Sequence, residues 1–112
     1  MRLEDLDGEQ VLLLDDGHCL RDQALAVCSA QGATELGDFR ATSLGTLTQM
    51  VTGGDAMTLL PELALDLETR GRRDLAVRPF RSPPPHRTIG LAWRPSSPRE
   101  EEFRALAESL AI

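Results

Sequence analysis

Two cysteines, Cys19 and Cys28, are the residues of this sequence whose type and spacing could do chemistry. A thiolate attacks hydrogen peroxide and becomes a sulfenic acid, which a second thiol can convert to a disulfide. Cys19 stands at the predicted start of a helix, where unpaired backbone N–H groups and the helix dipole favour an anion. His18 and Arg21 add positive charge nearby, whereas Asp22 opposes this effect if it faces the sulfur. These features predict a reactive thiolate at Cys19.

The spacing of the two cysteines sets a geometric problem for a disulfide between them. Nine residues of intact helix correspond to about 13 Å of rise and about half a turn of rotation. A disulfide needs Cα atoms within about 7 Å of each other, so the pair cannot be bridged while the helix is intact. Oxidation would then act as a conformational switch. Two cysteines on a helix can equally be inert packing residues, and the spacing leaves that alternative open.

The cysteines and histidines do not fit a metal site. Cys19 and Cys28 are nine residues apart, with His18 adjacent and His86 far along the chain. Zinc sites use shorter and more regular spacings. We therefore expect no metal ion and no cofactor.

Short apolar runs alternate with segments of helical spacing along the chain. Ser43 is a good N-cap for a helix that stops at Gly53, and Gly32 is a plausible end for the cysteine helix. We expect strands at 11–14, 39–42, 56–60, 75–79 and 88–93, and helices at 19–31, 44–52, 61–65 and 99–110. This alternation predicts an α/β fold with a largely parallel sheet. Ligands of such folds bind at the carboxyl ends of strands, which is where Gly17, His18 and Cys19 fall.

Composition limits the classes of function. The chain has 112 residues with 41% hydrophobic residues, which suits one folded domain. Its net charge of −6, with scattered arginines, argues against direct DNA contact. The sequence shows no signal peptide and no apolar run of about 20 residues, so we expect a cytoplasmic protein without a membrane anchor. Cysteines in that reducing compartment are expected to be buried or chemically active.

Three stretches of the sequence resemble one family in the right order. They are Leu14-Asp15-Asp16-Gly17-His18-Cys19-Leu20-Arg21-Asp22-Gln23-Ala24-Leu25 followed by Cys28, the stretch from Phe39-Arg40-Ala41-Thr42-Ser43-Leu44 to Leu59-Leu60-Pro61-Glu62-Leu63-Ala64, and Arg87-Thr88-Ile89-Gly90-Leu91-Ala92-Trp93-Arg94. Together they resemble the peroxide-sensing, OxyR-like members of the LysR-type transcriptional regulators. The resemblance covers nearly the whole chain.

The resemblance implies roles for individual residues. Cys19 would be the peroxidatic cysteine and Cys28 the resolving one. Gly17, His18, Arg21 and Asp22 would form the peroxide pocket and activate the thiolate. Thr42 and Ser43 would line an effector cleft. Implied partners are hydrogen peroxide, a glutaredoxin- or thioredoxin-type reductant, and further copies of the regulatory domain.

The resemblance also implies a partial fold. The chain would be the C-terminal portion of a LysR substrate-binding domain, which is α/β and similar to periplasmic binding proteins. Residues 1–80 would belong to its second lobe and residues 86–112 would return into its first lobe. The winged helix-turn-helix is absent from the sequence, so DNA would be reached only through a missing N-terminal domain.

Two other functions stay open at this point. The same cysteine chemistry would serve a thiol peroxidase that turns over, although the sequence offers no separate docking feature for a reductase, and we expect no enzyme. A truncated effector-binding or dimerisation module without redox activity is the other alternative.

Overall fold

Strand β1 (Gln10–Leu14) lies at the centre of the fold, and both of its faces are buried. Val11 and Leu13 face one cluster, which is completed by Leu6, Ala24, Cys28 and Ala33. Leu12 and Leu14 face the opposite cluster, with Ala41 and Leu47. Because successive side chains of a strand point to opposite faces, a continuous apolar run is what a strand covered on both sides requires.

The computed structural model describes residues 1–111 and pairs β1 in parallel with β2 (Thr34–Ala41). Val11 aligns with Glu35, but Leu13 aligns with Arg40, so β2 bulges outward between these two residues. On its other edge β1 pairs with Met57, whose N–H donates to the Gln10 carbonyl at 3.2 Å. The result is a short parallel sheet with one bulged edge.

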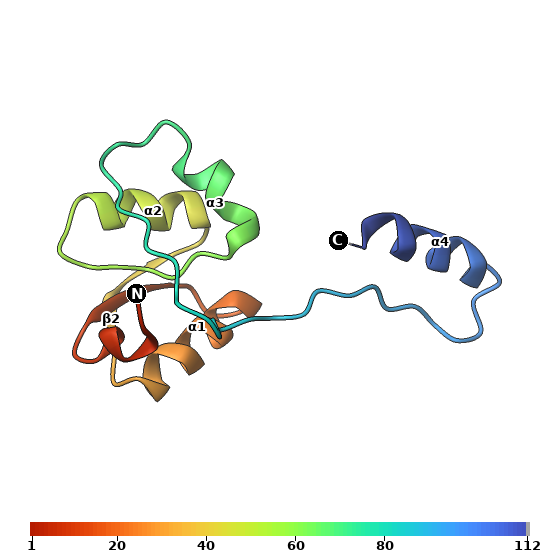
Figure 1. Cartoon of the computed structure of the whole chain (residues 1–112), viewed down its shortest axis with the longest axis horizontal. Helices are drawn as coiled ribbons and strands as arrows, with labels where there is room; N and C mark the ends of the chain where they lie inside the picture. Colours follow the sequence, from red (N-terminus) through yellow and green to blue (C-terminus); the bar gives the residue numbers. More distant parts are fainter. Residues whose placement is uncertain (112) are drawn as a thin grey trace.

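Helices cover both faces of this sheet (Figure 1). Helix α1 (Cys19–Ala30) packs on one face, and α2 (Leu44–Thr52) packs on the other. Helix α2 begins where predicted, because the Ser43 hydroxyl accepts a hydrogen bond from the Thr46 N–H at 3.2 Å. Helix α3 (Glu62–Thr69) lies beside α2, and a 3-10 helix (Leu3–Leu6) precedes the sheet.

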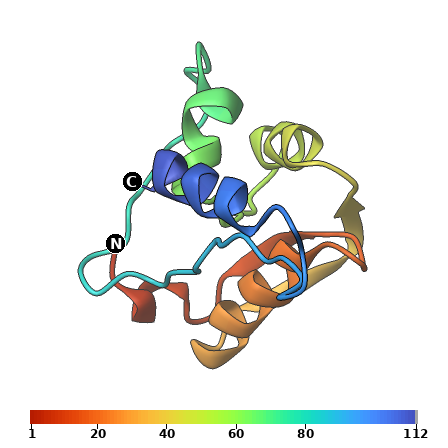
Figure 2. The same cartoon turned by 90° about the vertical axis from the view of Figure 1, so that its right-hand side faces the viewer.

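The last part of the chain leaves this body. Residues 82–98 form an arm without regular structure, and the arm ends in helix α4 (Glu100–Leu110). Figure 1 shows α4 to the side of the body, and Figure 2 looks along the long axis with α4 in front. Helix α4 has no buried residue. Its apolar face is therefore left largely exposed.

The predicted α/β class and all four predicted helices are confirmed, while the predicted strands are confirmed only in part. The strand predicted at 39–42 begins earlier, at Thr34, and α3 runs on to Thr69. The strand predicted at 56–60 is reduced to one bridge, at Met57. The prediction of strands at 75–79 and 88–93 is wrong. Within residues 1–111 the sheet has two strands, and these two segments have no strand beside them to exchange hydrogen bonds.

Candidate functional site

Cys19 is the first residue of α1 and lies on the surface with a free thiol. The turn that leads into it contains Gly17, whose φ of 91° lies in the left-handed region that glycine adopts without strain. His18 is the N-cap residue, with extended backbone and an exposed side chain that makes no capping hydrogen bond. Cys19 therefore lies within the first turn of the helix, where backbone N–H groups have no helical acceptor.

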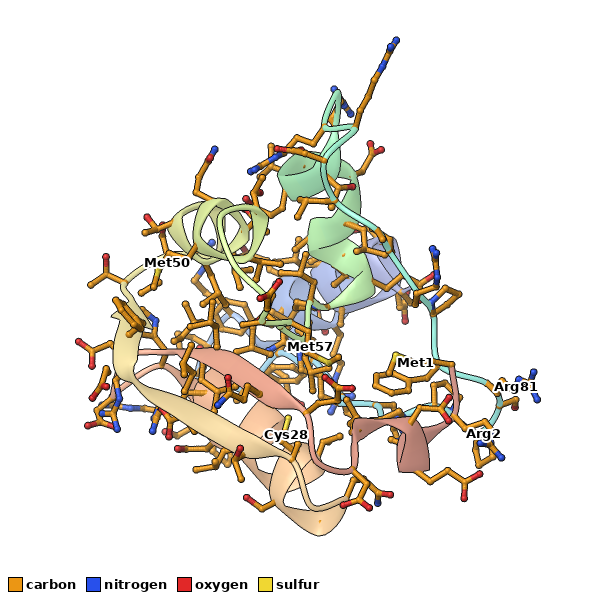
Figure 3. The ribbon with its side chains drawn as sticks, turned by 90° about the vertical axis from the view of Figure 1, so that its left-hand side faces the viewer. Met1, Arg2, Cys28, Met50, Met57 and Arg81 are labelled. Carbon is orange, nitrogen blue, oxygen red and sulfur yellow. The ribbon has the colours of Figure 1, made fainter. Side chains whose placement is uncertain are left out.

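Cys28 lies on the same helix in the opposite environment. Its side chain is 2% exposed and packs with Val11, Leu13 and Ala24 in the cluster between α1 and the sheet. Figure 3 shows its sulfur in this layer, between the α1 ribbon and the strands. Burial raises the pKa of the Cys28 thiol, because the thiolate would lose its hydration. In this conformation Cys28 is a protonated core residue that solvent does not reach.

Helix α1 is continuous from Cys19 to Ala30 and holds the two thiols apart. Over the nine residue steps from Cys19 to Cys28, helical geometry gives about 13 Å of axial separation. One side chain faces solvent and the other faces the core. The structure confirms the predicted geometry, in which no disulfide can form without a change in α1.

Arg21, two residues after Cys19, is buried and belongs to an ion-pair network. Its guanidinium donates to both carboxylate oxygens of Glu35, at 2.6 and 2.9 Å, and to the Leu14 carbonyl at 2.9 Å. Its Nε lies 3.0 Å from an oxygen of Asp16. The hydrogen bonds with Arg21 hold the pKa of Glu35 below its usual range. The network fastens the start of α1 to the end of β1 and to β2.

Arg40 completes this network from the edge of the sheet. It contacts Asp16 at 2.9 Å and Glu35 at 3.3 Å. The bulge in β2 makes the second contact possible, because it brings Arg40 back beside Glu35 after four intervening residues. The charge of Arg21 is thus committed to two carboxylates. The predicted role of Arg21 in activating the Cys19 thiolate stays a prediction, with its guanidinium now seen to be paired with these carboxylates.

The other predicted site residues lie at two separate places. Asp22 is exposed on the first turn of α1, close to Cys19 in the chain. Thr42 and Ser43 are exposed at the junction of β2 and α2, where Ser43 acts as a helix cap. The structure gathers Gly17, His18, Cys19 and Asp22 around one helix start, and Thr42 and Ser43 lie outside that group.

Sequence reasoning missed the partners of Arg21. Glu35 and Arg40 belong to β2, and nothing in their spacing relative to Arg21 identifies them. Asp16 lies five residues before Arg21, across the turn, so helical spacing would not pair them either. The one available signal is an arginine on the buried side of a helix, beside Ala24 and Cys28, since a buried cation requires a carboxylate partner.

A broad apolar cleft of about 700 Å³ opens elsewhere on the body. Its walls come from α1, α2, α3 and the segment 75–89, including Val27, Val51, Leu63 and Phe80. Cys19, Thr42 and Ser43 are not among its lining residues. The predicted peroxide pocket and effector positions are therefore separate from this cleft.

Residues 1–111 contain neither a metal-binding cluster nor a membrane-spanning helix. No three side chains of His, Cys, Asp or Glu gather there in an arrangement that could hold a metal ion. In that same range, every helix is too short or too polar to cross a membrane.

Comparisons with known proteins agree on one family. The model of the LysR substrate binding domain matches residues 1–111. The DNA-binding transcriptional dual regulator OxyR of Escherichia coli K12 is 50% identical over 108 residues, which are 96% of this chain and 35% of that protein. A probable hydrogen peroxide-inducible genes activator of Mycobacterium avium is 50% identical over 98 residues, 87% of this chain and 31% of its own length. The chain spans about a third of the length of these relatives.

Solved structures show the same relationship. The crystal structure of the oxidized form of OxyR superimposes with a TM-score of 0.74 at 50% identity, covering 97% of this chain and 51% of that one. The reduced form of the regulatory domain of OxyR2 from Vibrio vulnificus gives a TM-score of 0.70 at 38% identity, covering 96% and 51%. The chain thus matches about half of a regulatory domain.

Proposed function

The chain belongs to the family of LysR substrate-binding domains, and from that premise we propose that it is the redox-sensing part of an OxyR-like transcription regulator. It would respond to hydrogen peroxide by reversible formation of a Cys19–Cys28 disulfide. The observation that carries the proposal is the placement of the two thiols at opposite ends and opposite faces of one intact helix. A bond between them would convert a chemical event into a change of shape.

The proposed chemistry has two steps. The Cys19 thiolate attacks one oxygen of hydrogen peroxide, the O–O bond breaks, and the products are a Cys19 sulfenic acid and, after protonation, one water. The Cys28 thiol, once exposed and deprotonated, then attacks the Cys19 sulfur and displaces the hydroxyl as a second water. The two thiols lose two electrons in total, and peroxide gains them. Two equivalents of an external thiol reduce the Cys19–Cys28 disulfide back to two thiols and are themselves joined in a disulfide.

Exposure and burial give the two cysteines different roles. Cys19 is open to solvent, so peroxide reaches it without any opening of the fold. Cys28 is shielded in the core, and its raised pKa keeps it protonated until α1 loosens. We therefore assign the first attack to Cys19 and the resolving step to Cys28, which must leave its cluster before it can react.

The residues around Cys19 would shape this reactivity. Gly17 supplies the turn that leads into helix α1. His18 and Asp22 are exposed and are close to Cys19 in the sequence. Arg21 acts indirectly, because its ion pairs with Glu35 and Asp16 fix the position of the helix start. Thr42 and Ser43 would take no part in the cysteine chemistry and would instead face an effector in a complete domain.

We also propose where the chain stands in its family. Residues 1–80 would form the second lobe of the regulatory domain, and residues 86–112 would return toward its first lobe. DNA would be contacted by another part of such a regulator and not by this acidic segment. A cytoplasmic glutaredoxin- or thioredoxin-type protein would restore the thiols.

Thiol titration with mass spectrometry tests the proposal. Addition of micromolar peroxide should remove two free thiols per chain and join the peptides that contain Cys19 and Cys28. The matched variants are Cys28→Ser, which should stop at a sulfenic acid on Cys19, and Cys19→Ser, which should leave Cys28 reduced. If both thiols stay free at that concentration, the proposal fails.

The same samples separate a sensor from an enzyme. A sensor consumes about one peroxide per chain and then stops, whereas a thiol peroxidase continues as long as a thiol reductant is supplied. We expect consumption to end near one equivalent when no reductant is present and to stay slow with dithiothreitol. Rapid sustained turnover would favour the enzyme.

A further inference from the structure

The buried face of α1 is held on the sheet by one charged side chain and two small ones. Arg21, Ala24 and Cys28 are the buried residues of this helix. They stand at i, i+3 and i+7, which places them in one row that faces the sheet. Ala24 and Cys28 are small, so each buries only a modest apolar area. Arg21 is therefore the main polar attachment of this face of α1.

The ion pair between Arg21 and Glu35 encloses Cys28 in the sequence. Arg21 stands seven residues before Cys28 and Glu35 stands seven residues after it, and the two side chains meet at 2.6 and 2.9 Å. Arg21 also donates to the Leu14 carbonyl at 2.9 Å, which ties the pair to the end of β1. The chain on both sides of Cys28 is thus fastened at one point of the fold.

This ion pair is shielded from water. The side chains of Arg21 and Glu35 are 7% and 17% exposed, and interactions between shielded charges are screened much less than those at the surface. Asp16 adds a contact at 3.0 Å from the solvent side, where its own side chain is 77% exposed. Arg21 and Glu35 therefore form the strong part of the network, and Asp16 the weaker part.

Release of Cys28 and breakage of this ion pair are linked by the helix itself. Because Arg21 and Cys28 lie on the same face of α1, lifting or turning the helix to bring Cys28 toward solvent also draws Arg21 away from Glu35. That movement breaks two charge-assisted hydrogen bonds, which are stronger than neutral ones. The ease with which Cys28 leaves its cluster thus depends on the charge of Glu35.

We propose that Glu35 is a positioning residue for the resolving step: through Arg21 it latches α1 onto the sheet and keeps Cys28 in its cluster until the ion pair breaks. The inference deepens the proposed function and rests on it, because control of Cys28 matters only if Cys28 resolves a sulfenic acid on Cys19. The latch consists of contacts among α1, β1 and β2 alone.

Alkylation of Cys28 measures its release without any redox chemistry. The chain carries Cys19→Ser, so iodoacetamide can modify only Cys28, and mass spectrometry follows the modified fraction. At low reagent concentration the helix recloses faster than the thiol reacts, so the rate reports the population of the open state. Glu35→Gln keeps the size of the side chain and removes its charge, and it should speed alkylation about 10- to 100-fold. Asp16→Asn changes an exposed side chain, leaves the fold intact and should speed alkylation to a smaller extent.

Two control variants separate a latch from a general loss of stability. Leu47→Val removes volume from the cluster on the opposite face of the sheet, so it weakens the whole body without touching the network. Asp38→Asn makes the same kind of charge change at an exposed position of β2, outside the network. Both should leave the alkylation rate of Cys28 unchanged, although Leu47→Val should lower the urea midpoint.

A trapping experiment connects release with the resolving step. In the chain with both cysteines, peroxide is added together with dimedone, which captures a sulfenic acid on Cys19 in competition with Cys28. The ratio of disulfide to captured sulfenic acid is independent of the first step, because both products come from the same intermediate. Glu35→Gln should raise this ratio by about the factor by which it speeds alkylation.

Failure of the latch and failure of the proposed function give different results. If peroxide yields neither product, the proposed function fails and the control of a resolving step fails with it. If both products form but Glu35→Gln and Asp16→Asn change neither the alkylation rate nor the ratio, the latch is wrong and the redox proposal stands. Equal acceleration by Leu47→Val would also overturn the latch, since unfolding of the whole body would then expose Cys28.

Discussion

Replacement of Arg21 by methionine should destabilise the fold more than any other change to the ion-pair network. Methionine keeps the aliphatic part of the side chain but removes two hydrogen bonds to Glu35, one to the Leu14 carbonyl and the contact with Asp16. The Glu35 side chain, 17% exposed, would keep only Arg40 at 3.3 Å. Breaking a fully buried ion pair costs about 3–5 kcal/mol. Because Glu35 keeps one charged partner and stays partly exposed to solvent, we expect Arg21→Met to lower the free energy of unfolding by about 2–4 kcal/mol.

Urea unfolding followed by ellipticity at 222 nm measures this effect. Arg40→Met is the matched control, because Arg40 is one-third exposed and meets Asp16 at the surface. It should cost less than about 1 kcal/mol. In a double-mutant cycle, Glu35→Gln should cost much less when Arg21 is already methionine. If Arg21→Met unfolds at the same urea concentration as the wild type, or Arg40→Met costs as much, the network does not hold the start of α1.

Three further predictions concern the same body. Because α1 provides 12 helical residues and α2, α3 and α4 provide 9, 8 and 11, full oxidation should remove about a fifth to three-tenths of the helical ellipticity, and Cys28→Ser should abolish that loss. The lowered pKa of Glu35 means that its carboxylate stabilises the fold above the ordinary value of 4.5 and that this stability is lost as pH falls through the folded value. Urea midpoints should thus drop below about pH 4.5 in the wild type and less in Arg21→Met. Finally, Ser43→Ala should cost about 1 kcal/mol by loss of the α2 cap, whereas Thr42→Ala, beside it and without a capping bond, should cost less than half as much in the same urea assay.

Local sequence signals predicted the helices well. Ser43 and Gly53 mark the two ends of α2, and the apolar spacing around Cys28 marks the buried face of α1. The strand at the centre was equally clear, since four consecutive apolar residues need a cover on both sides. The opposite environments of Cys19 and Cys28 followed from helical periodicity alone.

Pairing between distant segments could not be predicted in the same way. The segment 75–79 has the composition of a strand, but a strand exists only where a neighbour offers hydrogen bonds, and that depends on the whole fold. The bulge that brings Arg40 beside Glu35 is a matter of register between β1 and β2. For the same reason the partners of Arg21 became visible only in three dimensions.

Hydrogen exchange of α1 in the disulfide form tests most directly whether joining Cys19 to Cys28 rebuilds the segment between them. Chains with no remaining free thiol would be compared with reduced chains by mass spectrometry, with α2 as the internal reference. We predict that amides of α1 lose their protection on oxidation while those of α2 keep it. Fully oxidised chains in which α1 stays as protected as in the reduced state would contradict the account.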